Sequence, residues 1–415
     1  MMILLRSLSS TITAIVIGFF SSILLSRLLG PEGRGYYFTL TFFASLIYGV
    51  SQLGLAETTL YYYRKGAIEL KNSIAKKMTF VLLVSLFPIA FSVFYIKSIP
   101  EFSNETIVFF LILCITNIPY SFLLHLSQVE KNLYFYNKTR VIIPVLSVAG
   151  LCLLYGIDDV DVNSAIGVLC LSNFLGVVYL STFFIRNEFP INKGEYNNSE
   201  MTIFSLQVFG TNISGIIVNN LDKIILINIV SAFDLGLYTT AYATSRLIGF
   251  IPQTMSTIAY SRFAGRVGKD AEIFFNVLFS STFIPCLILS ILLGVMSFWF
   301  FPFLFGVEFS SASIIFLILS VECVLSGFSW FVSQYFNSKG NPKIVLIRQW
   351  VSMFPLIFIM FYSGEYIIMF TSLLLLFSSL IRLLVSCFLF NRESKKCKIK
   401  LLPSICEIKK LREML

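Results

Sequence analysis

Long apolar runs constrain this chain of 415 residues more than any other feature of its sequence. A helix needs about 20 apolar residues to cross a bilayer, and about twelve runs of that length follow one another along the chain. Charged residues make up only 13% of the sequence, whereas soluble domains carry about 25%. Because the runs are continuous, they do not fit barrel strands, which alternate apolar and polar residues. The sequence therefore predicts an all-α polytopic membrane protein.

The runs predict about twelve membrane-spanning helices in two six-helix bundles around a central cavity. The expected spans are 7–28, 36–60, 78–97, 106–128, 140–157, 162–185, 202–230, 234–261, 274–300, 308–336, 344–363 and 366–390. Their connections are too short to hold a folded extramembrane domain. The expected parts are a first bundle at 1–190, a cytoplasmic linker at 191–201, a second bundle at 202–391 and a basic cytoplasmic tail at 392–415.

Lysine and arginine residues are distributed unevenly between alternate connections. Twelve spans place most of the 31 residues of these two types on one side, Arg348 among them. The other side receives only Arg27, Arg34 and Lys97 from the connections. Because basic connections face the cytoplasm, both ends of the chain are expected there. The net charge of +9 then reflects membrane topology rather than a nucleic-acid partner.

Two short connections resemble each other and predict an internal repeat. Residues 32–37, EGRGYY, open the second span, and residues 234–238, DLGLY, open the eighth. In each case an acidic residue precedes a Gly-x-Tyr pattern. A separation of six spans gives both halves the same orientation, as in transporters with parallel repeats. The alternative is chance similarity between short connections.

The seventh span is the most informative of the polar-faced spans. Ser205, Asn212, Asn219 and Lys223 recur there at helical spacing, so they share one face. Asp222 precedes Lys223 and points about 100° away from it. Ionisable groups are costly within a membrane, which makes each of them a candidate functional residue.

The eighth and tenth spans carry further polar residues. Tyr242, Arg246 and Gln253 share one face of the eighth span, and Glu322 lies in the tenth. Two interpretations follow for the three polar-faced spans. Either they line a water-accessible cavity, or their cations pair with the carboxylates Asp222 and Glu322 to hold helices together.

The first bundle offers two candidates of its own. Arg27 flanks the tight turn at 30–33 and either binds an anion or extends to lipid headgroups. Glu57 lies near the end of the second span. It either anchors against the neighbouring basic residues or takes part in ion coupling.

Motifs for catalysis are missing from the sequence. The single histidine, His125, has no neighbouring pattern that predicts a hydrolase triad. No GxxxxGK[ST] sequence is present to bind a nucleotide. With one histidine and no CxxC pair, a metal site is not expected. We therefore expect neither an enzyme nor a cofactor.

Two segments resemble polysaccharide-export flippases of the O-antigen and capsule type. Residues 25–36, LSRLLGPEGRGY, resemble the sequence that follows the first span in that family. Residues 220–226, NLDKIIL, and 235–242, LGLYTTAY, resemble its seventh-to-eighth span region. The family belongs to the multidrug/oligosaccharidyl-lipid/polysaccharide exporter superfamily. Chain length, span number and cytoplasmic ends agree along nearly the whole chain.

The resemblance implies a transporter in a bacterial inner membrane, whose two bundles open a central cavity alternately to either side. It implies an undecaprenyl-pyrophosphate-linked oligosaccharide repeat unit as substrate. Membrane lipid and the machinery that polymerises the repeat units are the other implied partners. The family uses cationic cavity residues in the first half and the eighth span, and Arg27 and Arg246 match them.

Our hypothesis assigns roles to the candidates in three groups. Pyrophosphate is assigned to Arg27, Arg246 and Lys223, sugar to Asn212, Asn219, Tyr242 and Gln253, and ion coupling to Asp222, Glu322 and Glu57.

Three other functions are weighed against this hypothesis. Lipid II flippases carry additional arginines in the second span, and this chain has none between Gly35 and Leu60, which disfavours a peptidoglycan role. A cation-coupled multidrug antiporter of the same superfamily is the main alternative. A membrane polysaccharide polymerase or glycosyltransferase would need a large extracytoplasmic loop, and the expected loops are short.

Overall fold

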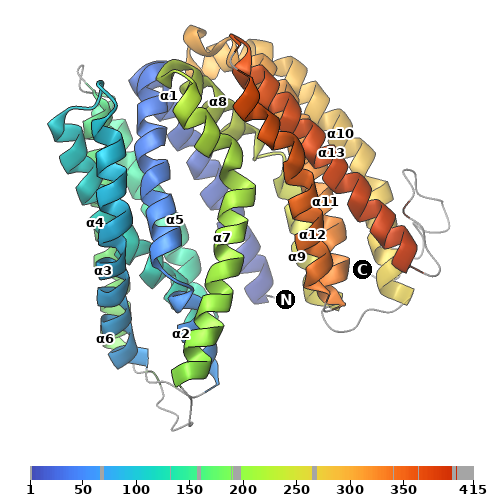
Figure 1. The fold of residues 1–415 in the computed structure, drawn as a ribbon, viewed down its shortest axis with the longest axis horizontal. Helices are drawn as coiled ribbons and strands as arrows, with labels where there is room; N and C mark the ends of the chain where they lie inside the picture. The colour runs from blue at the N-terminus through green and yellow to red at the C-terminus, as the bar shows by residue number, and fades with distance from the viewer. Residues whose placement is uncertain are drawn as a thin grey trace. The chain divides into compact units, whose positions relative to one another are not determined.

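The computed structural model describes residues 2–65, 70–130, 132–156, 160–187, 189, 198–263, 269–339, 341–362, 364–394 and 399. Nearly all of them are helical, and these ranges contain no strand, which confirms the predicted fold class (Figure 1). The helices are α1 Met2–Ser51, α2 Leu55–Arg64, α3 Leu70–Lys97, α4 Asn104–Leu126, α5 Tyr134–Leu154, α6 Val162–Arg186, α7 Asn198–Ile229, α8 Ala232–Ser245, α9 Phe250–Phe263, α10 Lys269–Phe305, α11 Ala312–Ser338, α12 Pro342–Met353 and α13 Ile367–Glu393, with 3-10 helices η1 Ser127–Val129, η2 Val307–Phe309 and η3 Phe354–Phe361. Most of the predicted linker 191–201 and tail 392–415 lies outside the described residues.

Within the described residues, ten helices are long and apolar enough to cross a membrane. One of them, Ser9–Ser51, has 43 residues and would be about 65 Å long if straight, twice the bilayer core. It reverses at Gly30, and Figure 1 shows its two limbs side by side. A further span is divided between α8 and α9. Counting two spans in α1 and one in the α8–α9 pair recovers the predicted number.

Large apolar side chains cover the outer surfaces of the helices. Phe87, Phe94, Trp299 and Phe361 are 82%, 79%, 72% and 80% exposed, respectively. Exposed apolar area of this extent is unfavourable in water and favourable against lipid chains. The chain is therefore a multi-pass membrane protein.

Three spans expected to be continuous helices are interrupted, so those expectations were wrong. The second is broken at 52–54, the eighth at 246–249, and the eleventh changes to a 3-10 helix after Met353. Leu53 and Gly54 have positive φ angles of 48° and 69°. Pro252 and Pro355 explain the other two breaks. A proline lacks the N–H that a helix needs, and its ring clashes with the carbonyl four residues earlier.

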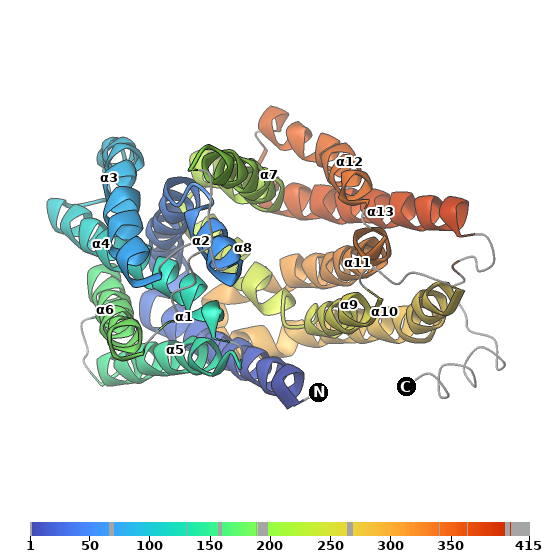
Figure 2. The same ribbon diagram turned by 90° about the horizontal axis from the view of Figure 1, so that it is seen from below.

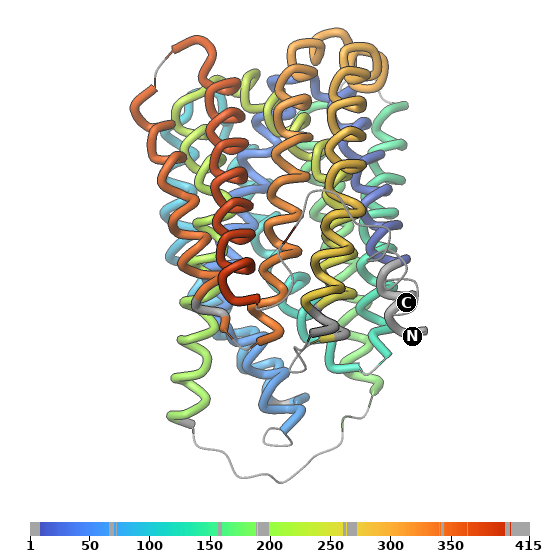
Figure 3. The backbone as a smooth tube through the Cα atoms, turned by 90° about the vertical axis from the view of Figure 1, so that its right-hand side faces the viewer, coloured from blue at the N-terminus to red at the C-terminus, as the bar shows by residue number. Residues whose placement is uncertain are grey.

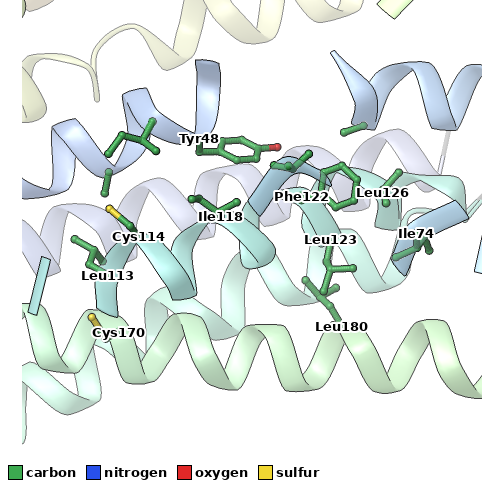
Figure 4. Close-up of a cluster of buried hydrophobic side chains, with 14 of the residues drawn as sticks. Tyr48, Ile74, Leu113, Cys114, Ile118, Phe122, Leu123, Leu126, Cys170 and Leu180 are labelled. Carbon is green, nitrogen blue, oxygen red and sulfur yellow. The ribbon is translucent and has the colours of Figure 1, made fainter. Parts of the chain in front are cut away.

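The structure consists of two compact units, residues 1–219 and 220–415, and the division falls within α7. The bundle boundaries expected at 190 and 202 stay a prediction. In the first unit α4 packs on α6, and α1 packs on α5. Its core contains Ile118, Phe122 and Leu180, which are fully buried (Figure 4). Gly176 permits the α4–α6 approach, because a Cβ there would lie 2.7 Å from the Tyr120 ring.

The first part of α7 belongs to the first unit and packs where the second span is broken. The break leaves the Leu53 carbonyl without a helical partner, and the Ser205 hydroxyl donates to it at 2.7 Å. The rings of Phe204 and Tyr61 stack with their centres 4.7 Å apart. Side-chain hydrogen bonds thus compensate for the interrupted helix.

In the second unit α11 is the central helix. It packs against α8, α9, α10, α12 and α13. Viewed end-on in Figure 2, α11 lies between α13 on one side and α9 with α10 on the other, and Figure 3 shows α11 in orange between α10 and α13. This position explains why the polar residues of α11 are shielded from lipid. Pro252 of α9 approaches Gly327 of α11 so closely that a Cβ there would lie 2.4 Å from the proline ring.

The turn between the two limbs of α1 depends on Gly30. Its φ of 64° and ψ of −178° lie in a region that only glycine occupies readily. We expect Gly30→Ala to destabilise the protein by about 1–3 kcal/mol and to lower its thermal unfolding midpoint in detergent. Gly18→Ala is the matched control, because a Cβ at Gly18 would meet nothing within 4 Å. Equal midpoints for the two variants would contradict this explanation of the turn.

Candidate functional site

The end of α7 and the start of α8 hold a buried ion pair. Lys223 Nζ lies 3.2 Å from Asp222 Oδ2, and the two side chains are only 6% and 3% exposed. The Tyr238 hydroxyl of α8 donates to the same Asp222 oxygen at 2.5 Å. Asp222 thus accepts hydrogen bonds from both neighbours, which compensates for its removal from water.

Tyr242 connects this ion pair to Arg246, one turn further along the chain. Lys223 Nζ lies 3.9 Å from the centre of the Tyr242 ring, and Arg246 Cζ lies 4.2 Å from it. A cation this close to an aromatic face is stabilised by the ring's quadrupole. Tyr242 therefore stabilises two cations at once.

Arg246 marks the point where the eighth span is interrupted. It follows the last residue of α8, and its backbone N–H donates to the Tyr242 carbonyl at 3.3 Å. Its Nη2 donates to Glu322 Oε2 of α11 at 2.5 Å. Glu322 is 7% exposed and Arg246 is 34% exposed, and Arg246 Nε has no hydrogen-bond partner in the described part of the chain. Arg246 therefore combines a buried carboxylate partner with a side chain that remains partly exposed.

The residues described so far form one polar cluster in the second unit, which we call the Arg246 cluster. It consists of Asp222, Lys223, Tyr238, Tyr242, Arg246 and Glu322. Its two cations are paired with its two carboxylates: Arg246 with Glu322 of α11, and Lys223 with the adjacent Asp222 within α7, although helical spacing alone points these two side chains about 100° apart. Arg246 is the more exposed of the two cations. Broken helices in membrane transporters commonly carry the ligand site, because their ends expose unpaired backbone groups.

The first unit brings two other predicted residues together. Asn212 Nδ2 donates to Glu57 Oε1 at 3.2 Å, while Glu57 Oε2 is buried without a hydrogen-bond partner in the described ranges. Glu57 opens α2, directly after the break in the second span. Nearby, the Tyr48 hydroxyl lies 2.8 Å from His125 Nδ1 and donates to Gln52 Oε1 at 3.1 Å.

The remaining predicted residues lie outside these two groups. Arg27 is exposed on the first limb of α1, Asn219 is exposed on α7, and Gln253 is exposed on α9. The break at 246–249 separates Gln253 from Tyr242 and Arg246. The expectation that Gln253 shares one helical face with Tyr242 and Arg246 was therefore wrong, because it assumed a continuous helix.

Sequence reasoning missed the roles of two arginines in the second unit. Arg348, placed with the cytoplasmic connections, is 2% exposed within α12. Its Nη1 donates to the Ser329 carbonyl at 2.7 Å and to Ser386 Oγ at 2.9 Å. Arg382 of α13 donates from Nε to Ser352 Oγ at 3.1 Å. An arginine followed four residues later by a serine occurs in both helices, and this spacing was the signal available.

The structure shows no candidate metal centre. In the described part of the chain, no three His, Cys, Asp or Glu side chains gather in a way that could hold a metal ion.

Comparisons with known proteins agree with this architecture. A family model described as polysaccharide biosynthesis protein matches residues 4–260. No match is found among curated proteins. The lipid II flippase MurJ, in its inward closed conformation, has a TM-score of 0.71 at 17% identity, and the alignment covers 91% of this chain and 86% of that chain.

Two further solved structures share the fold. An inward-facing multidrug resistance MATE family transporter of the MOP superfamily has a TM-score of 0.67 at 13% identity, with 91% of this chain and 94% of that chain covered. A MOP superfamily transporter from Pyrococcus furiosus has a TM-score of 0.56 at 13% identity, with 94% and 95% covered. The family model spans more than half of the chain. The chain therefore belongs to the family of polysaccharide biosynthesis proteins and has the fold of the MOP superfamily transporters.

Proposed function

We propose that this protein is a flippase for an undecaprenyl-pyrophosphate-linked oligosaccharide repeat unit. It moves this lipid from the cytoplasmic to the periplasmic leaflet of a bacterial inner membrane, for O-antigen or another surface polysaccharide. Both termini are cytoplasmic, as the distribution of basic residues favours. The observation that carries the proposal is Arg246, a partly exposed guanidinium at a helix break in a membrane span.

The chemistry of the substrate explains why such a residue is needed. A pyrophosphate group is anionic, and its transfer into hydrocarbon is prohibitive unless a protein pairs its charge. Guanidinium groups bind phosphate oxygens through two parallel hydrogen bonds. When the pyrophosphate binds, Arg246 exchanges its contact with Glu322 for the substrate, and the lipid tail stays in the membrane. No bond is made or broken, so the activity is transport.

The other residues take supporting roles in this proposal. Arg27 is the candidate anion-binding residue of the first unit, and Lys223 supports Arg246 through the ring of Tyr242. The exposed amides of Asn219 and Gln253 suit contact with sugar hydroxyls. Asn212 is assigned to sugar less directly, since its amide already donates to Glu57.

One observation favours a second function, that of a cation-coupled multidrug antiporter. Glu57 Oε2 is buried without a partner in the described residues, and a proton or a metal cation would satisfy it. Asp222 and Glu322 offer the other membrane carboxylates, but both are already paired with cations. Carboxylates that are paired with Lys223 and Arg246 suit an anionic substrate better than a cationic drug.

The test is deletion of the gene in its host, with surface polysaccharide and the lipid-linked oligosaccharide pool measured together. We expect surface polymer to disappear while complete repeat units accumulate on the cytoplasmic leaflet, and a plasmid copy to restore both. Unpolymerised units on the outer leaflet would instead identify a polymerase. Unchanged pools with increased drug sensitivity would identify the antiporter.

A further inference from the structure

The second unit contains more positive charge in its membrane spans than its carboxylates balance. Away from the helix ends, the cations in the described spans of residues 220–415 are Lys223, Arg246, Arg348 and Arg382, and the carboxylates are Asp222 and Glu322. Each carboxylate already has one cation, Lys223 for Asp222 and Arg246 for Glu322. Arg348 and Arg382 therefore lack a carboxylate of their own within the described residues.

These two arginines bind each other's helices through serines. Arg348 and Ser352 lie one turn apart on α12, and Arg382 and Ser386 lie one turn apart on α13. Arg348 donates to Ser386, and Arg382 donates to Ser352. Arg348 also donates to Ser329 Oγ of α11 at 2.5 Å. Serine hydroxyls accept hydrogen bonds from a guanidinium but leave its charge uncompensated, which is costly within a membrane.

Arg382 differs from Arg348 in its accessibility. Arg348 is 2% exposed, whereas Arg382 is partly exposed. Within the part of the chain that the structure describes, Arg382 makes a hydrogen bond only through Nε, so its Nη1 and Nη2 are unused. Neither of these nitrogens is among the buried unpaired atoms, in keeping with the partial exposure of the side chain.

The helix that carries Arg382 packs beside elements of the Arg246 cluster. The helix α13 packs on both α11 and α8, and the charges of Glu322 and Arg246 act electrostatically on Arg382. Two arginines with partly exposed side chains thus lie on neighbouring elements of the same unit. A single phosphate group needs only one guanidinium as its partner, whereas a diphosphate has two phosphate groups and can pair with two guanidinium groups.

We propose that Arg382 is a second diphosphate-binding residue, which takes one phosphate of the substrate while Arg246 takes the other. The inference rests on the proposed function and specifies the chemistry of its site. Arg348 and the serines hold α12 and α13 together beneath it. The alternative is that Arg382 only joins two helices, in which case it would not affect which anion binds.

The test uses the purified full-length protein in detergent, with inorganic pyrophosphate and inorganic phosphate as separate probes. Binding of each is measured by titration, and the preference is the ratio of the two Kd values. We expect the wild-type protein to prefer pyrophosphate by about tenfold, because two charge-assisted contacts replace one. Arg382→Gln should lose that preference while its phosphate affinity changes little.

Arg34→Gln is the matched control. Arg34 is also a membrane arginine that donates to a serine, Ser22 at 3.2 Å, but unlike Arg382 it is buried, and it belongs to the first unit. This variant should keep the wild-type preference. If Arg382→Gln does not fold, Arg382→Lys is measured instead. It retains the charge without the paired donors, so its preference should fall about threefold.

The outcomes separate this inference from the proposed function. An unchanged preference in the folded Arg382 variant, together with lost binding in Arg246→Gln, would overturn the Arg382 assignment and leave the flippase proposal standing. A wild-type protein that binds neither anion would overturn both. A lost preference in Arg34→Gln as well would show that general destabilisation, rather than Arg382, determines the selectivity.

Discussion

Replacing Arg246 with glutamine is expected to lower export of the surface polysaccharide by about 100-fold. The variant removes the guanidinium that we assign to the substrate pyrophosphate. Truncating one partner of a close charge pair costs about 2–5 kcal/mol, and each 1.4 kcal/mol changes an equilibrium about tenfold. The measurement is surface polysaccharide in a deletion strain that carries the variant, normalised to the amount of protein in the membrane.

The control for this prediction addresses Glu322, which Arg246→Gln leaves buried without its partner. In Arg246→Gln/Glu322→Gln both charges are replaced by amides of similar shape, so the protein should regain wild-type abundance but not export. Glu322→Gln alone removes the competitor for Arg246 and should bind pyrophosphate at least as tightly as the wild type. Restored export in the double variant would show that Arg246 acts only as a partner for Glu322.

Replacing Lys223 with methionine is expected to reduce the amount of folded protein severely. Asp222 is 2% exposed, and without Lys223 it would remain as a buried carboxylate with Tyr238 as its donor. Removing one partner of a buried ion pair costs about 3–5 kcal/mol, which is comparable to the whole stability of many proteins. The measurements are abundance in the membrane and the thermal unfolding midpoint in detergent.

The paired variant Asp222→Asn/Lys223→Met distinguishes the two roles considered for Lys223. Both charges are removed, so abundance should return to near the wild-type level. If export returns as well, Lys223 is structural and Arg246 holds the pyrophosphate without it. If abundance returns and export does not, Lys223 binds the substrate. A single Lys223→Met variant of normal stability would contradict the contribution assigned to the buried pair.

The sequence was sufficient to predict the class of fold and the number of spans. Continuous apolar runs leave helices as the only way to satisfy backbone groups in lipid, and length then determines each span. The interruptions of the helices were harder to predict from the sequence, because a membrane helix can also tolerate residues such as Pro252 and Gly54 without a break. Only the observed φ angles and the 246–249 break show where the helices end.

The candidate site was only partly predictable, because spacing along one helix is visible in the sequence but contacts between helices are not. Helical spacing placed Tyr242 and Arg246 on one face of the eighth span, and the structure stacks them. Which cation pairs with which carboxylate depends on contacts between helices far apart in the chain, such as Arg246 with Glu322. The sequence did not identify Arg348 as a buried membrane residue, because it lies near the end of a span and the count of basic residues therefore assigned it to a connection.

The most direct test of the flippase proposal is lipid translocation by the purified protein in vesicles. The probe is an undecaprenyl-pyrophosphate-linked oligosaccharide with a fluorescent label on its sugar, and a membrane-impermeant quencher reports the exposed leaflet. We expect the wild-type protein to make nearly all of the label accessible, while Arg246→Gln leaves the inner-leaflet fraction protected. Wild-type vesicles that do not move the lipid, or an Arg246→Gln protein that moves it at the wild-type rate, would contradict the assignment of Arg246 as the residue that carries the pyrophosphate.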